Sequence, residues 1–74
     1  MNAEELKRKL EEANIPPYLY NLDGKGRTDE RFCLQKLGGV EWQVYYVERG
    51  VKTTDLRFAT EEEACAYIYN KLHG

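Results

Sequence analysis

The sequence predicts an α+β domain in the order α-β-β-β-α, with a three-stranded antiparallel meander between an N-terminal and a C-terminal helix. The first and last segments carry apolar residues at helical spacing, whereas the middle of the chain alternates apolar and polar residues as half-buried strands do. The chain has 74 residues, too few for two domains, so residues 1–74 are predicted to form a single domain.

The first helix is predicted over residues 2–13, because its apolar residues form one narrow stripe. Asn2 is placed to cap its N-terminus. Asn14 is expected to take the left-handed conformation that ends the helix, so that Ile15 folds back on Leu10. The two prolines that follow prevent the helix from continuing.

A connection of loop character follows over residues 16–29, with turn signals at Asp23-Gly24 and at Gly26. Its first half is too apolar for a free loop. We expect four of its side chains to lie across one end of the core: Tyr18, Leu19, Tyr20 and Leu22.

Three strands are predicted, over residues 30–36, 40–48 and 53–58. The register that keeps the apolar side chains on one face pairs Trp42 with Phe58, Val44 with Leu56 and Tyr46 with Thr54. It places Glu48 opposite Lys52 and leaves a three-residue loop, or its bulged equivalent, at the tip.

The first hairpin has two possible registers. A two-residue turn at Gly38-Gly39 would put Cys33 and Leu37 on the core face, whereas a three-residue loop would put Phe32 and Leu34 there. We prefer the second register, because its side chains are larger.

The last helix begins after Thr60, which forms a capping-box pattern with Glu63. Three consecutive glutamates then lie at the positive end of the helix dipole. One face of this helix is expected to pack on the core, with Tyr67 and Tyr69 on its two flanks; that face carries Ala64, Cys65, Ile68 and Leu72.

The net charge and the hydropathy of the chain argue against two classes of partner, nucleic acids and membranes. Eleven Lys and Arg against thirteen Asp and Glu give a net charge of −2, which argues against nucleic acid as the partner. No apolar run approaches the ~18 residues of a membrane span, and no signal-peptide pattern is present, so a cytoplasmic protein with no membrane partner is predicted. Reduced cysteines fit that compartment, although Cys33 and Cys65 would approach each other if both faced the core.

No residue pattern predicts catalysis, a cofactor or a metal site. The single histidine, His73, is close to the end of the last helix, and neither cysteine has the spacing of a zinc ligand. The glycines of residues 24–27 lack the strand-to-helix context of a phosphate-binding loop. The chain is therefore predicted not to be an enzyme.

Double-stranded-RNA-binding domains share the α-β-β-β-α order. They present lysines to phosphates at the start of the last helix, where this chain carries Glu61, Glu62 and Glu63. RNA binding is therefore the less favoured alternative.

Two motifs resemble a group of small bacterial proteins. Residues 42–52 match the pattern W-x-V-Y-Y-x-E-R-G-x-K, and residues 58–67 match F-x-S/T-E-x-E-A-C-x-Y. The resemblance covers residues 5–72 and includes the helix exit at Asn14-Ile15-Pro16. The group is that of immunity proteins encoded beside polymorphic or contact-dependent-inhibition toxins. It implies an antitoxin that binds and neutralises a cognate toxin domain in bacterial competition.

Six tyrosines suit a protein-binding surface, because tyrosine packs its ring and keeps its hydroxyl in water. The expected partner-binding residues are Tyr45, Val47, Arg49 and Arg57 on the open side of the sheet, and Tyr18 and Tyr20 in the long connection. A nuclease is one candidate for the toxin, since an acidic, tyrosine-rich surface complements a basic one. The alternative function is a self-associating or structural module, such as a homodimer paired through a strand edge.

The capping residue of the last helix gives a first prediction. Thr60→Ala should lower the free energy of unfolding by about 1 kcal/mol, because it removes the acceptor for a backbone N–H in the first turn. Urea unfolding of the parent and the variant measures the difference. Equal midpoints would show that Thr60 does not stabilise the helix.

Overall fold

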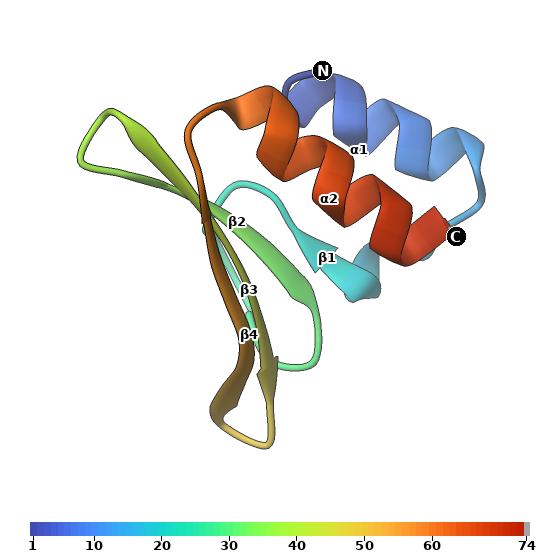
Figure 1. Cartoon of the computed structure of the whole chain (residues 1–74). Helices are drawn as coiled ribbons and strands as arrows, with labels where there is room; N and C mark the ends of the chain where they lie inside the picture. The colour runs from blue at the N-terminus through green and yellow to red at the C-terminus, as the bar shows by residue number, and fades with distance from the viewer. Residues whose placement is uncertain (74) are drawn as a thin grey trace.

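Both helices lie on one face of a four-stranded sheet (Figure 1). The computed structural model describes residues 1–73. In chain order the elements are α1 (Ala3–Glu12), the 3₁₀ turn η1 (Pro17–Leu19), β1 (Tyr20–Asn21), β2 (Phe32–Leu37), β3 (Glu41–Glu48), β4 (Val51–Phe58) and α2 (Glu61–His73). The α+β class and the two terminal helices are as predicted. Within the described residues, neither helix is both long and apolar enough to cross a membrane.

The predicted three-stranded antiparallel meander is incomplete, because the long connection contributes a fourth strand. β1 pairs with β2 in parallel, with Tyr20 beside Phe32 and Asn21 beside Cys33, so the sheet is mixed and its order is β1-β2-β3-β4. A strand of two residues has no alternation to detect in the sequence. Its pairing depends on where α1 and η1 deliver the chain, which is a tertiary property.

The register predicted for β3 and β4 is confirmed. Trp42 pairs with Phe58, Val44 with Leu56 and Tyr46 with Thr54. The tip is the bulged form: Arg49 and Gly50 make a two-residue turn, and both have the positive φ that a type I′ turn requires. Glu48 consequently pairs with Val51 rather than with Lys52, and Thr53 is the additional residue that restores the register.

The first hairpin takes the preferred register. Leu37 pairs with Glu41 across a three-residue loop, which places Leu34 in the core and Phe32 against it. The strand begins at Phe32 rather than at Glu30, because Glu30 adopts a left-handed conformation with φ of 56° and its N–H binds the carbonyl of Val47.

The core lies between the helices and the sheet. Its buried side chains are Leu6, Leu10, Tyr20, Leu34, Val44, Ala64, Cys65 and Ile68. Aromatic rings continue it toward β4, since Tyr67 lies 6.4 Å from Phe32 and 5.6 Å from Phe58 between ring centroids. Leu56 was expected inside as a neighbour of Val44. It is 39% exposed, because it lies on the edge strand β4, where the helices cover it only in part.

The end of α1 follows the prediction. Asn14 has φ of 60°, the Ile15 N–H donates to the Leu10 carbonyl at 2.9 Å, and the Asn14 N–H donates to the Glu11 carbonyl at 3.0 Å. This is the hydrogen-bond pattern of a Schellman motif, and it brings Ile15 onto the core.

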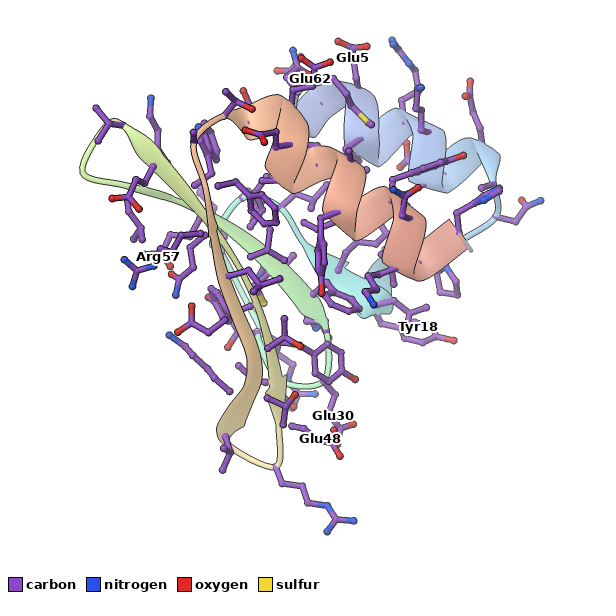
Figure 2. The ribbon with its side chains drawn as sticks, viewed as in Figure 1. Glu5, Tyr18, Glu30, Glu48, Arg57 and Glu62 are labelled. Atoms are coloured by element: carbon purple, nitrogen blue, oxygen red, sulfur yellow. The ribbon has the colours of Figure 1, made fainter. Side chains whose placement is uncertain are left out.

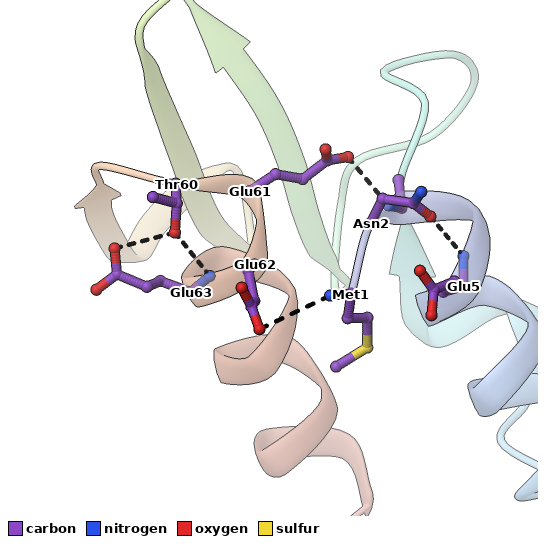
Figure 3. A network of polar contacts seen from close by, with 8 residues as sticks. Met1, Asn2, Glu5, Thr60, Glu61, Glu62 and Glu63 are labelled. Carbon is purple, nitrogen blue, oxygen red and sulfur yellow. Dashed lines mark hydrogen bonds and ion pairs between the residues drawn. The ribbon is translucent and has the colours of Figure 1, made fainter.

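The two helices run parallel, with their N-termini together (Figures 1 and 3). The Ala3 N–H, at the start of α1, donates to the Glu61 carboxylate of α2 at 3.0 Å. Further along the pair, the Lys9 Nζ lies 5.9 Å from the centre of the Tyr69 ring. Parallel neighbouring helices bring two positive dipole ends together, and the acidic side chains in both first turns offset that repulsion.

Each helix also caps its own start. The Asn2 Oδ1 accepts from the Glu5 N–H at 2.9 Å, and the Thr60 Oγ1 accepts from the Glu63 N–H at 3.1 Å. The Thr60 hydroxyl in turn donates to the Glu63 carboxylate at 3.0 Å. These two caps are local, whereas the bond of Glu61 joins the first turn of one helix to that of the other.

Glu61→Ala should lower the free energy of unfolding by about 1 kcal/mol, because the Ala3 N–H loses a charged acceptor in a partly buried position. Glu62→Ala is the matched control at the same helix end. Its side chain is 79% exposed and only meets the terminal amine at 4.0 Å, so its removal should have a much smaller effect. Urea unfolding of both variants measures this difference, and equal losses would contradict a specific role for the Glu61 bond.

Candidate protein-binding face

The helices leave the opposite face of the sheet without a helical cover (Figure 1). We call this surface the outer face. Its side chains form two cross-strand rows, Cys33–Tyr45–Asp55 and Gln35–Gln43–Arg57, with Val47 and Lys52 paired beyond the first row. The outer face is therefore built from β2, β3 and β4, whose pairing holds it rigid.

Polar contacts fix several of these side chains. The Gln43 Nε2 donates to the Asp55 Oδ1 at 2.7 Å, which satisfies an amide that is 4% exposed. The Lys52 Nζ lies 4.7 Å from the centre of the Tyr45 ring, within cation–π range. Burial raises the pKa of the Tyr45 hydroxyl, and its neighbour Cys33 raises it further. Tyr45 is thus held in place between a cation and a neutral thiol.

The segment between β1 and β2 crosses part of the outer face. The Cys33 thiol donates to the carbonyls of Thr28 and Arg31 at 3.4 and 3.5 Å, and Asp29 forms an isolated bridge with Val47. Glu30 and Glu48 lie near each other at this end (Figure 2). The cover is incomplete, because Tyr45 and Val47 remain half-buried rather than enclosed.

The predicted partner-binding residues fall into separate places. Tyr45 and Val47 are half-buried on the outer face, Arg57 is exposed there, and Arg49 is exposed at the hairpin tip. Tyr18 is 64% exposed on η1, well apart from Arg57 in Figure 2. The structure therefore brings four of the six residues to one side of the molecule.

Tyr20 is a correction. It was expected both across one end of the core and on a binding surface. Its side chain is 7% exposed and belongs to the core, which confirms the first expectation and contradicts the second. Its hydroxyl is buried without a hydrogen-bond partner in the described residues, and burial raises its pKa. The ring belongs to the same buried cluster as Leu6 and Leu10 of α1, so it is not available to a partner. Of the two partner-binding residues predicted in the long connection, only Tyr18 is exposed.

Lys52 is a residue that sequence reasoning missed. Alternation along β4 would place it on the core side with Thr54, but the additional residue Thr53 reverses its direction. It therefore pairs with Val47 and lies over Tyr45. The sequence allowed a bulge in this hairpin, because the predicted register permitted a bulged tip. It did not show which residue forms the bulge, so the direction of Lys52 could not be predicted.

Asn21 organises the glycine-containing segment that follows β1. Its Nδ2 donates to the carbonyls of Lys25 and Arg27 at 2.9 and 2.7 Å, and its Oδ1 accepts from the Gly24 N–H at 2.9 Å. The Lys25 N–H binds the Asp23 carboxylate at 2.9 Å. Two backbone N–H groups that a phosphate cradle would need are already used, so this segment is an Asx-stabilised turn.

A groove of about 310 Å³ lies between α1 and β1. Carboxylates and cations both line it, among them Glu4, Asp23, Lys7 and Arg31. Mixed charges without a converging set of donors give no basis for one ligand class. Among residues 1–73, no group of three His, Cys, Asp or Glu side chains is arranged to hold a metal ion.

The two cysteines lie on opposite sides of the sheet. Cys33 is buried in the outer face beneath residues 28–31, whereas Cys65 is buried in the core on α2. The sequence predicted that Cys33 and Cys65 would approach each other only if both faced the core, and Cys33 does not face it. Burial raises the pKa of the Cys33 thiol, and it raises that of Cys65 from 9.0 to about 11 with a smaller contribution from Glu61.

The shift of Cys65 predicts a loss of stability at high pH. The unfolded chain releases this proton near pH 9.0, whereas the folded chain keeps it until pH of about 11, so the stabilisation is complete below pH 9 and is lost between these values. The loss should reach about 3 kcal/mol. Urea unfolding across this range should show a shallower decline for Cys65→Ala than for the parent, and parallel declines would contradict the assignment.

The charges of the molecule are divided between two regions. The outer face and the adjoining tip mix both signs of charge, with Arg49, Lys52 and Arg57 beside Glu41, Glu48 and Asp55, whereas five glutamates gather at the N-termini of the helices. No protein-family model, curated protein or solved structure matches the chain. The comparisons therefore assign no family, and the function proposed below depends on the outer face and on the expectation drawn from residues 42–52 and 58–67.

Proposed function

We propose that this protein is an immunity protein, which binds a cognate toxin domain through the outer face and neutralises it by occlusion. The observation that carries the proposal is a half-buried aromatic and aliphatic pair that keeps part of its surface in solvent, Tyr45 and Val47, beside the exposed cations Arg49 and Arg57. Tyrosine and arginine are the residue types most enriched at binding hot spots. Of the two motifs that resemble immunity proteins, the first, residues 42–52, specifies Tyr45 and Arg49 and leaves the position of Val47 unspecified.

Neutralisation by occlusion requires a rigid, complementary surface and no chemistry. The central strand β3 supplies Tyr45 and Val47, and its pairing on both sides fixes their directions before binding. A surface that is ordered in the free protein loses little conformational entropy when it binds. The Tyr45 ring would enter an apolar depression on the toxin domain, and the arginines would bind carboxylates at its rim.

The charge of the outer face refines the expected partner. The outer face carries cations and carboxylates together, so a complementary patch on the toxin domain would also carry both signs of charge. The basic substrate-binding surface of a nuclease would instead suit the acidic helix ends, where the Glu61 carboxylate already accepts from the Ala3 N–H and the Glu63 carboxylate from the Thr60 hydroxyl. We therefore place the contact away from a nuclease's nucleic-acid channel, in the bacterial cytoplasm where the toxin would act.

Tyr45→Ala should weaken the complex with the toxin domain encoded beside this gene by at least about tenfold, because it removes the hot-spot ring. Isothermal titration calorimetry measures the affinity. A thermal melt separates loss of binding from loss of fold, since Tyr45 also contacts Lys52. Arg49→Ala is a second variant at an exposed side chain, and it should weaken binding without changing the melt.

Tyr18→Ala is the matched control, because that tyrosine is 64% exposed and lies off the outer face. It should leave the affinity unchanged. If Tyr18→Ala lowered the affinity for the toxin domain and Tyr45→Ala did not, the contact would lie at η1 and not on the outer face. Co-expression with the neighbouring toxin should restore bacterial growth. The immunity function would fall if no toxin gene accompanied this one and expression protected cells against none.

A further inference from the structure

Strand β4 is a long free edge of the sheet. It is last in the strand order and pairs only with β3, so half of its backbone N–H and C=O groups point away from the molecule without a strand to receive them. Leu56, in the middle of its second half, is 39% exposed on the helix side. Natural proteins usually protect such an edge, because it pairs readily with another chain.

The second half of β4 is suited to pairing. The bulge at Thr53 disturbs only the end near the hairpin tip, and residues 54–58 continue in regular register with β3. This five-residue segment has Leu56 at its centre. A regular, bulge-free stretch of this length can form a ladder with a strand on its free side.

The side chains of this segment are complementary to a second copy of themselves. In an antiparallel pair centred on Leu56, each Leu56 meets Leu56 of the second copy on the helix side. On the outer face, Asp55 of each copy then lies opposite Arg57 of the other copy. The two-fold symmetry therefore gives two such pairs. Centring the pair on Asp55 instead would place like charges opposite each other, which is destabilising.

The charged groups of this segment remain available. Asp55 uses one carboxylate oxygen, Oδ1, for Gln43, and Arg57 makes no hydrogen bond or ion pair with any of residues 1–73. Both side chains are exposed. An antiparallel strand from another protein would need an acidic, an apolar and a basic residue in that order from its N-terminus to its C-terminus. A second copy of this chain supplies that order.

We propose that the free edge of β4 binds a second copy of this chain, antiparallel and centred on Leu56, to form a two-fold dimer with one continuous sheet. Both sets of helices then lie on one side of that sheet, and both outer faces lie on the other. The dimer does not depend on the function proposed above. It would present two copies of the Tyr45 surface side by side.

Charge reversal tests the register. Sedimentation equilibrium of the parent should show an average mass that rises with concentration from the 8.7 kDa of one chain toward twice that value. Asp55→Arg and Arg57→Asp should each weaken the dimer at least about tenfold, because each places like charges opposite each other twice. The double variant carries the reversed pair and should restore the parent affinity.

A cysteine cross-link tests the centre. Leu56→Cys should form a disulfide-linked dimer under mild oxidation, because residues directly opposite in an antiparallel pair lie within disulfide reach. Thr54→Cys is the matched control on the same side of the strand, where Phe58 of the second copy lies opposite. It should not cross-link, and neither should the parent, whose two cysteines are buried.

The proposal is overturned by a parent that keeps the mass of one chain at every concentration up to about 1 mM. It is equally overturned if the double charge variant fails to recover the dimer while it melts as the parent does. Cross-linking of Thr54→Cys as fast as Leu56→Cys would also overturn the register.

Discussion

The packing of two parallel helices on one face of the sheet encloses the core, and the hydrogen bond from the Ala3 N–H to the Glu61 carboxylate joins the first turns of these helices. Parallel helices side by side on one face are electrostatically unfavourable, because their positive ends meet. The Glu61 carboxylate of α2 accepts a hydrogen bond from the Ala3 N–H of α1, and its negative charge offsets the repulsion between the two positive helix ends. The local caps at Asn2 and Thr60 stabilise each helix but do not bring the helices together.

Placing both helices on one face gives the two sides of the sheet different chemistry. The helix side encloses an apolar core around Leu6, Val44 and Ile68. Among residues 1–73, the other side is partly covered by the segment that leads from β1 to β2, which contacts Cys33 and leaves Tyr45 half-buried. A surface available for a partner therefore arises as a consequence of where the helices pack.

One additional residue in β4 determines much of the remaining surface. Thr53 allows a tight two-residue turn at the hairpin tip and still keeps Val44 opposite Leu56. It also turns Lys52 from the core side to the outer face, where its cation lies over Tyr45. Because the bulge is confined to the tip, the rest of the edge strand stays regular.

The sequence by itself determined the elements whose signals are local. Capping residues, the left-handed Asn14 and the alternation along β3 each act within a few residues, so the helix ends and the β3–β4 register followed from them. Strand β1 and the direction of Lys52 were decided by the tertiary structure. These features depend on contacts between segments far apart in the chain, or on a bulge whose position no single residue marks. The candidate face shows the same division, because alternation predicted that Tyr45 and Arg57 share a side, while the partial cover over that side follows from how the chain crosses the sheet before β2.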